Sequence, residues 1–378
     1  MKFWNSKNID AVGALYNIVI GERGNGKTTE ILNKIMENYA KRGEMGVIIR
    51  KLDTQISGKR AQGMWNNINA MGWVTKLTDG EYDRVIVRAA QCHFARYNED
   101  TDTVVISPDH FCNYLSLNQA EHNKSIAYPN VTVIMYEEFL SRKIRLTDEF
   151  DLFLSTVSTV IRHRKDAKVY LMGNTVTSRS VYFENLNIRN ILDMEQGSIA
   201  THMRTNKKTG EEFPFAAVEY CAPTEGGKES DIYYNFSDKD EKSMITDGSW
   251  DHGQYPKPTK YYTSNDVKAN IWFTDGGFNI NILGKLIKRK GDVYLFISRQ
   301  DPAWRPSDMR YKLDVTYSLI PSSSNRVYMD PTISYGNRFT ALIAVLFREG
   351  RVFFDNNYSG EELADYIHKA QSYSILKI

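Results

Sequence analysis

Short apolar runs alternate with segments of helical periodicity over the first 175 residues. The run from Tyr16 to Ile20 is apolar apart from Asn17 and ends at a glycine, which predicts a strand. From Thr28, apolar residues recur every three or four positions up to Gly43, which predicts a helix ending at that glycine. Further strands are expected over 47–49, 131–136 and 169–172, and a further helix over 146–161. This alternation predicts a parallel sheet with helices on both faces.

The pattern changes after about residue 222. Residues 224–258 are rich in Gly, Ser, Asp and Lys and have little periodicity, as a linker or small irregular subdomain would. Strands at 270–273, 279–283 and 293–297 and a helix at 361–371 indicate a second α/β domain. We therefore expect three parts: an N-terminal domain over 1–223, a linker or lid over 224–258, and a C-terminal domain over 259–378.

The composition narrows the class of protein. The 378 residues are 42% hydrophobic and 25% charged, with a formal net charge of +2, which is ordinary for a globular chain and excludes an overall basic coat. No run of 18 apolar residues and no secretory leader is visible, so neither a membrane span nor export is expected. Three cysteines and seven histidines lack metal-ligand spacing, which predicts no metal site built from protein ligands alone and fits a reducing cytoplasm.

A full GxxxxGK[ST] phosphate-loop motif lies between the first strand and the first long helix. Backbone N–H groups of such a loop surround phosphate oxygens, and the helix N-terminus adds positive charge. A lysine at the seventh position contacts the β- and γ-phosphates, and the following hydroxyl binds Mg²⁺. A chance glycine turn is the alternative. The expected nucleotide-binding residues are Gly21, Glu22, Arg23, Gly24, Asn25, Gly26, Lys27, Thr28 and Thr29.

Two glutamates follow the apolar strand at 131–136. A buried strand that carries carboxylates at its end is how phosphate-loop enzymes hold the Mg²⁺ shell and position water. We expect Glu137 to take the metal role and Glu138 to act as the general base. The alternative is a solvated pair of acids at the start of a helix.

Two further signals are weaker. Arg162, His163 and Arg164 end the helix before the fourth strand, where a cation either reaches a neighbouring subunit's γ-phosphate or stabilises the helix dipole. Asn174 follows that fourth strand, where it either senses the γ-phosphate or occupies a turn.

Four blocks carry a family resemblance: NIVIGERGNGK (17–27), AYPNVTVIMYEEF (127–139), TVIRHRKDAKVYLMGN (159–174) and, more weakly, REGRVFFDNNY (348–358). The chain resembles the DNA-packaging (encapsidation) ATPases of small podophages of the picovirus type, relatives of terminase large subunits. That resemblance implies a P-loop NTPase domain of the additional-strand class and a ribonuclease-H-like C-terminal domain that has lost its metal-binding acids.

The resemblance also implies roles for individual residues. Lys27 and Thr28 match the Walker A pair, and Glu138 matches the catalytic glutamate. Arg162 matches the arginine that acts on a neighbour's nucleotide, and Asn174 matches the sensor. The family has Asp where this chain has Glu137, which puts the metal geometry there in question.

Cations on loops are the candidates for gripping double-stranded DNA through its phosphates. The dense run at 285–290 has the equally ordinary explanation of a solvated turn. The candidates are Arg142, Lys143, Arg50, Lys51, Lys59, Arg60, Lys285, Lys288, Arg289 and Lys290.

These observations favour an ATP- and Mg²⁺-dependent motor that packages double-stranded phage DNA into a procapsid. The resemblance implies that it forms a homo-oligomeric ring, a pentamer, on the portal. The ring would contact the portal either directly or through an RNA adaptor. It would act in the host cytoplasm, transiently on the procapsid, without membrane contact, and would be absent from the mature virion. One alternative is a terminase-type motor whose nuclease is active through Asp275, and another is a DNA-independent P-loop kinase or switch.

Overall fold

The chain forms two compact units, Met1–Asp251 and His252–Ile378, which are considered separately below. The computed structural model describes residues 3–124, 126–141, 146, 148–162, 164–175, 180–188, 191, 194–223, 255–258, 262–275, 278–300, 312–314, 319–321, 327–329, 345–346 and 348–375. The expected linker at 224–258 lies almost wholly outside the described residues, which include only its last four positions.

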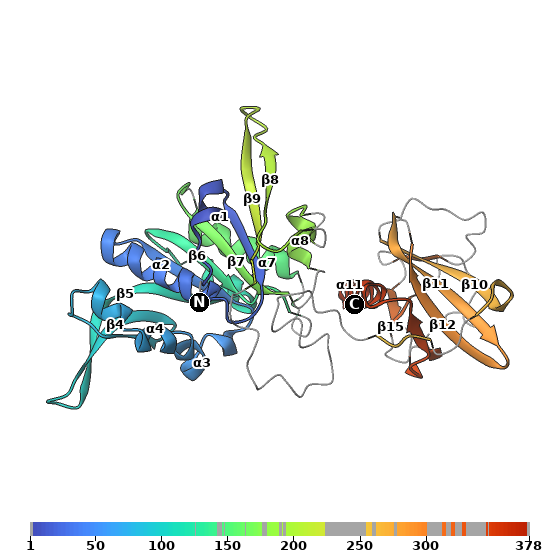
Figure 1. Ribbon diagram of the computed structural model, residues 1–378, viewed down its shortest axis with the longest axis horizontal. Coiled ribbons are helices and arrows are strands. Elements are labelled where there is room, and N and C mark those ends of the chain that lie inside the picture. The colour runs from blue at the N-terminus through green and yellow to red at the C-terminus, as the bar shows by residue number, and fades with distance from the viewer. Residues whose placement is uncertain are drawn as a thin grey trace. The chain divides into compact units, whose positions relative to one another are not determined.

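A nine-stranded sheet is the centre of the first unit (Figure 1). Its order is β3-β4-β5-β2-β6-β7-β1-β9-β8, so β7 lies between β1 and β6. The strands are β1 (Tyr16–Gly21), β2 (Met45–Arg50), β3 (Arg84–Arg88), β4 (Gln91–Asn98), β5 (Thr103–Ser116), β6 (Val131–Glu137), β7 (Lys168–Asn174), β8 (Ile199–Thr205) and β9 (Glu212–Tyr220). The run from β5 to β9 is parallel throughout, which brings the carboxyl ends of β2, β6, β7 and β1 to one edge.

Helices cover both faces of this sheet, as expected. On one face, α2 (Lys27–Arg42) packs Ile31 and Ile35 into one hydrophobic core, and on the other α7 (Glu149–Ile161) packs Phe153 and Val157 into a second. Successive β1 residues alternate between the two cores. The remaining helices are α1 (Lys7–Val12), α3 (Gly58–Gly63), α4 (Asn66–Ala70), α5 (Trp73–Leu77), α6 (Ala120–Asn123) and α8 (Val181–Asn185).

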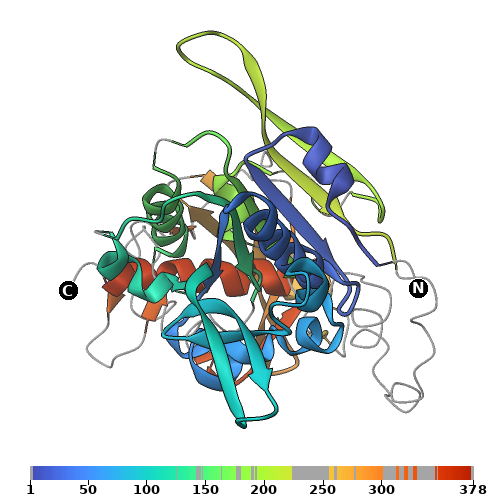
Figure 2. The same cartoon turned by 90° about the vertical axis from the view of Figure 1, so that its left-hand side faces the viewer.

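The sheet is mixed rather than wholly parallel, so the expected parallel sheet is correct only for its middle. Strands β3, β4 and β5 pair antiparallel at one margin, and β8 pairs antiparallel with β9 at the other. Both views show the β8–β9 hairpin extending from the body of the first unit (Figures 1 and 2). These outer strands carry many exposed polar positions, and so they lack the solid apolar runs that identified the central strands.

The second unit is built on a five-stranded sheet of order β13-β10-β11-β12-β16. Strands β10 (Val267–Asp275), β11 (Phe278–Arg289) and β12 (Asp292–Arg299) form an antiparallel meander. At its two sides, β13 (Lys312–Asp314) runs parallel to β10, and β16 (Val352–Phe354) runs parallel to β12. A two-stranded ladder, β14 (Leu319–Pro321) with β15 (Val327–Met329), and helix α11 (Asn357–Ile375) complete the described part. Among the described helices, none has the length and apolar character needed to cross a membrane.

Candidate nucleotide-binding site

The glycine loop between β1 and α2 has the conformation that its motif requires. Gly24 and Gly26 have φ angles of +79° and +90°, a region that side-chain-bearing residues rarely adopt. Gly26 caps α2, and Lys27 is the first residue of that helix. The free N–H groups of the first helical turn therefore lie at the loop, and an anion there would meet both these donors and the helix dipole.

Lys27 is buried with neutral partners. Its Nζ donates to the Glu22 carbonyl oxygen at 2.6 Å and to Asn25 Oδ1 at 2.9 Å. Burial lowers the pKa of Lys27, and the nearby Glu137 carboxylate opposes that shift in part. Both bonded acceptors are uncharged, so an arriving phosphate can replace them and gain a stronger, charge-assisted bond.

Thr28 and Glu137 meet across the sheet edge. The Thr28 hydroxyl donates to Glu137 Oε1 at 2.9 Å, which joins the start of α2 to the end of β6. The other carboxylate oxygen, Oε2, is buried and has no hydrogen-bond partner among the described residues. Burial raises the pKa of Glu137, whereas Arg50 and the Thr28 hydrogen bond lower it. A buried oxygen without a partner beside a hydroxyl suits a hard divalent cation, so these residues fit Mg²⁺ despite the longer Glu side chain.

Glu138 is held by Arg50. The residue has a φ of +56° and its side chain is 55% exposed. Its Oε2 accepts from Arg50 Nη2 at 2.7 Å, and Arg50 comes from the end of β2, the strand beside β6. Arg50 was expected to contact DNA. The structure instead makes it the partner of the expected general base, because adjacent parallel strands end at the same sheet edge.

Asn174 lies beside the glycine loop. The register of β1 with β7 pairs Gly21 with Asn174, the last residue of β7. The preceding Gly173 has no room for a side chain, since a Cβ atom there would lie 2.8 Å from Phe139 Cε1. The segment after Glu138 therefore packs directly on the end of β7.

A cavity of about 430 Å³ collects these residues. Arg23, Gly24, Asn25, Gly26, Lys27, Thr28, Thr29, Glu137, Glu138 and Asn174 all line it. Gly21 and the buried Glu22, which were also expected to bind the nucleotide, are not among the residues that line it. Sequence reasoning missed the apolar part of its lining, which includes Phe3, Trp4, Met71 and Trp73, and the neighbouring Asn67. Scattered aromatic residues carry no spacing signal that would distinguish such a lining from a core.

Arg162 lies far from this cavity. It follows the last residue of α7, and its Nη2 donates to the Ile126 carbonyl oxygen at 3.1 Å, where β6 and β7 begin. The cavity lies where those strands end, and seven residues of β7 at about 3.3 Å each separate the two edges by roughly 20 Å. Arg164 donates to the carbonyl oxygens of Tyr128 and Val160, as a helix-capping cation does. Arg162 is exposed, and it lies too far from the cavity of its own chain to contact a ligand bound there.

The basic candidates of the first unit have different surroundings. Lys51, a candidate for contacting DNA, is 5% exposed and bonds Glu149 at 2.6 Å, so its ammonium group is buried in an ion pair and is not available on the surface. Lys59 and Arg60 are exposed at the start of α3, whereas Arg142 and Lys143 lie outside the described residues.

In the second unit, the basic run surrounds the β11–β12 turn without forming one patch. Lys285 donates to the Tyr262 hydroxyl and Arg289 lies 4.0 Å from Asp266, while Lys288 and Lys290 are exposed. The run is thus divided between paired and free cations, as a solvated turn would be.

Comparison with known proteins shows what the chain is similar to. Residues 107–195 match the family model described as Podovirus DNA encapsidation protein (Gp16), a segment that includes Glu137, Glu138, Arg162 and Asn174 but not the glycine loop. The chain is a relative of these encapsidation proteins, and the resemblance seen in the sequence is confirmed.

The curated relatives include the DNA packaging protein of Bacillus phage phi29, 24% identical over 189 residues, which are 49% of this chain and 50% of the relative. The chain thus spans about half the length of the curated relatives that it matches. A solved structure titled "The bacteriophage Phi-29 viral genome packaging motor assembly" is 17% identical, with a TM-score of 0.56 over 98% of this chain and 100% of that one. Another, titled "The Phi-28 gp11 DNA packaging Motor", is 12% identical, with a TM-score of 0.51 over 98% and 97% of the two chains. Both show a shared fold.

Proposed function

We propose that this chain is the ATP-hydrolysing subunit of a motor that moves double-stranded DNA into a phage procapsid. One observation carries the proposal: β1, β6 and β7 bring Lys27, the Thr28–Glu137 pair and Asn174 to one cavity. Nucleoside triphosphate hydrolysis requires a loop that binds the phosphates and a carboxylate that binds the cation. A third polar side chain, Asn174, lies at the end of β7, the strand between β1 and β6. The similarity to DNA packaging proteins indicates that DNA is what the motor moves.

Each residue has a role that follows from its contacts. Lys27 exchanges its carbonyl and amide partners for phosphate oxygens, and Thr28 with Glu137 would hold Mg²⁺, which neutralises charge on the phosphates. Glu138 takes a proton from the attacking water. Its carboxylate must first leave Arg50, because the guanidinium occupies Oε2, one of the two oxygens that could accept the proton.

The test is steady-state hydrolysis of ATP with and without long double-stranded DNA. Wild type is expected to hydrolyse faster with DNA. Glu138→Gln is expected to lose about 10²–10⁴-fold, the usual contribution of a general base, while still binding ATP. Glu99→Gln, an exposed glutamate at the β4–β5 turn, is the matched control and should behave as wild type. Robust hydrolysis indifferent to DNA would contradict the proposal and favour a kinase or switch.

A ring is supported by the position of Arg162, which lies at the sheet edge opposite to its own cavity. In rings that mix wild type with Arg162→Ala, hydrolysis per wild-type subunit is expected to fall as the variant fraction rises. Lys165→Ala, a nearby exposed cation, is the control. Unchanged hydrolysis per wild-type subunit would remove Arg162 from the mechanism.

The remaining assignments are part of the same proposal. The ring, a pentamer by resemblance, docks on the portal of the procapsid in the host cytoplasm, directly or through an RNA adaptor. The second unit is a ribonuclease-H-like domain, which the antiparallel β10–β11–β12 meander with β13 parallel to β10 supports. Asp275 ends β10, the place of a first catalytic acid, so nicking of plasmid lost in Asp275→Ala would identify an active nuclease instead.

A further inference from the structure

Two hairpins of the first unit extend past the strands beside them. Strand β9 pairs with β1 only from Ala216 onward, so the turn of the β8–β9 hairpin lies beyond the start of β1, by about 20 Å at about 3.3 Å per residue from Thr209. Strand β5 begins at Thr103 but pairs with β2 only from Cys112 onward, so the β4–β5 turn lies beyond the start of β2. Both hairpins therefore extend at the edge where the parallel strands begin, whereas the cavity lies where they end.

The turns of these two hairpins differ in charge. The four residues of the β4–β5 turn, between Asn98 and Thr103, include three exposed acids and no cation. The β8–β9 hairpin carries three exposed cations around its turn, and two exposed acids follow them on the returning side. The acids of the first turn are Glu99, Asp100 and Asp102, the cations of the second hairpin are Arg204, Lys207 and Lys208, and its acids are Glu211 and Glu212. A polyanion would be repelled by the first turn and attracted by the second.

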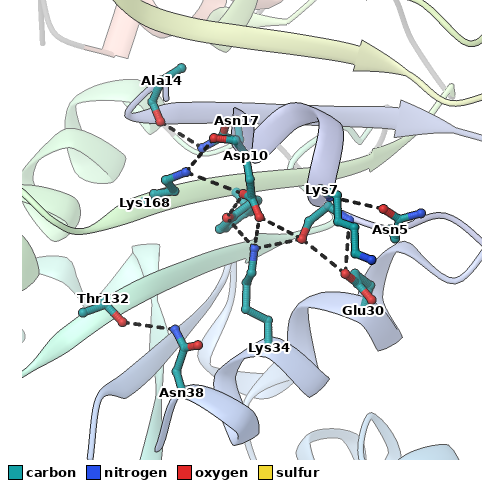
Figure 3. A network of polar contacts seen from close by, with 12 residues as sticks. Asn5, Lys7, Asp10, Ala14, Asn17, Glu30, Lys34, Asn38, Thr132 and Lys168 are labelled. Carbon is teal, nitrogen blue, oxygen red and sulfur yellow. Dashed lines mark hydrogen bonds and ion pairs between the residues drawn. The ribbon is translucent and has the colours of Figure 1, made fainter. Parts of the chain in front are cut away.

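The three hairpin cations have no acidic partner within the described part of the chain. Cations near the start of β1 do have one, since Lys34 and Lys168 both form ion pairs with Asp10 (Figure 3). Glu211 lies close to the hairpin cations in sequence, yet its carboxylate accepts from the Thr209 hydroxyl at 3.3 Å. The positive charge of the hairpin is therefore available to an anion from another molecule.

The turn that carries the two lysines is held by hydrogen bonds. The Asn206 carbonyl oxygen accepts from the Gly210 backbone N–H at 2.8 Å, and Asn206 Oδ1 accepts from the Lys208 backbone N–H at 2.9 Å. The Arg204 guanidinium lies over the Phe215 ring, 3.5 Å from its centroid. A stacked guanidinium keeps its N–H groups for acceptors, and a turn that is already ordered loses little conformational entropy on binding.

We propose that the β8–β9 hairpin contacts the phosphate backbone of double-stranded DNA through Arg204, Lys207 and Lys208. The inference rests on the proposed function and deepens it by naming an element that touches the DNA, one that the sequence had not singled out. Cations on a turn bind phosphates without reading bases, as a motor that moves along any sequence requires. The margin of the sheet at β8 would then face the DNA, and the acidic β4–β5 turn would point away from it.

The test measures binding of a mixed-sequence duplex of about 30 base pairs by fluorescence anisotropy, at salt concentrations from about 50 to 200 mM. The logarithm of the wild-type binding constant should fall linearly with the logarithm of the salt concentration. In Lys207→Ala/Lys208→Ala the slope should be smaller in magnitude by about 1.8, because each lost phosphate contact removes about 0.9. Lys207→Arg/Lys208→Arg keeps both charges and should keep the slope. Lys76→Ala/Lys165→Ala removes two exposed lysines elsewhere in the unit and is the matched control.

Hydrolysis of ATP gives a second readout. Without DNA, the double alanine variant should hydrolyse ATP as fast as wild type, because the turn lies beyond the sheet edge opposite to the cavity. Stimulation by long double-stranded DNA should be reduced in this variant and retained in the double arginine variant. Loss of hydrolysis without DNA would show a structural defect instead of a lost DNA contact and would overturn the assignment.

The remaining outcomes separate the hairpin from the function on which it rests. A wild-type salt slope in the double alanine variant, or an equal reduction in the Lys76→Ala/Lys165→Ala control, would overturn the hairpin contact alone. The hairpin also exposes two apolar side chains, Met203 and Phe213. If Met203→Ser/Phe213→Ser reduced self-association while the lysine variant bound DNA as wild type does, the hairpin would contact protein. Wild type that neither binds DNA nor hydrolyses ATP faster with it would overturn the proposed function as well.

Discussion

Two buried lysines, each after a strand of the same parallel run, show how the same residue serves two purposes. Lys27 follows β1 and Lys51 follows β2, and each is 5% exposed. Lys27 bonds a carbonyl and an amide oxygen, both neutral. Lys51 bonds the Glu149 carboxylate, which also accepts from the Tyr182 hydroxyl and from the Leu146 backbone N–H. A buried cation with neutral partners is prepared for an incoming anion, whereas one with an internal anion holds the fold together.

The largest expected effect on stability comes from substituting Lys51. Lys51→Met leaves the Glu149 carboxylate buried without its cation, so the free energy of unfolding should fall by about 3–5 kcal/mol. Adding Glu149→Gln removes that charge and should recover much of the loss, and Lys59→Met, at an exposed site, should be nearly neutral. Denaturant unfolding of the three variants measures this. A Lys51→Met protein as stable as wild type would show that the ion pair contributes little.

Lys27→Met should give the opposite result. Affinity for Mg·ATP should fall at least about 30-fold, because losing one partner of a buried charge pair costs about 2–5 kcal/mol. Stability should not fall. Burial lowers the pKa of Lys27, which means that burying its charge costs free energy in the folded state, and removing the charge removes that cost. Calorimetric titration and denaturant unfolding at pH 7 check both parts. A variant that is destabilised as much as Lys51→Met would erase the distinction between the two lysines.

A third lysine, Lys34, gives an intermediate case that depends on pH. Burial raises the pKa of its partner Asp10, but hydrogen bonds from Lys34 and Tyr170 outweigh it and the pKa falls below the ordinary 3.8. A depressed carboxyl stabilises the fold above its unfolded pKa and loses that contribution as pH drops through the folded value. Asp10→Asn should thus cost about 1–3 kcal/mol at pH 7 and progressively less below pH 3.8. Unfolding curves from pH 7 to pH 3 measure this, and a pH-independent difference would contradict it.

The central strands of the first unit could be predicted well from the sequence. The apolar runs predicted β1, β2, β6 and β7, and the glycine-loop motif placed Lys27 and Thr28 correctly at the start of α2. Glu137 and Thr28, 109 positions apart, could be paired because parallel strands end at one sheet edge. These elements are local or follow from topology, and both kinds of information are present in one sequence.

The parts that could not be predicted depend on contacts distant in sequence. Lys51 looks like any surface lysine until Glu149, 98 positions later, is folded against it. Arg50 looked equally suited to DNA, and its pairing with Glu138 needed the adjacency of β2 and β6. The apolar part of the cavity lining unites Phe3 with Met71 and Trp73, which share no spacing or motif. The strands at the two margins of the sheet were not predicted from the sequence, because the exposed residues on these strands interrupt the apolar runs.

Strand β1 pairs with β7 from Tyr16 to Gly21 on one side and with β9 from Tyr16 to Ile20 on the other. Amide protons in such a strand exchange with solvent only when the whole unit unfolds. The glycine loop is the direct continuation of that strand, so one of its ends is fixed to a strand that is paired on both sides. Deuterium uptake that differs between nucleotide-free and nucleotide-bound protein should therefore appear around Glu138 and the residues that precede α1, while β1 stays silent in both.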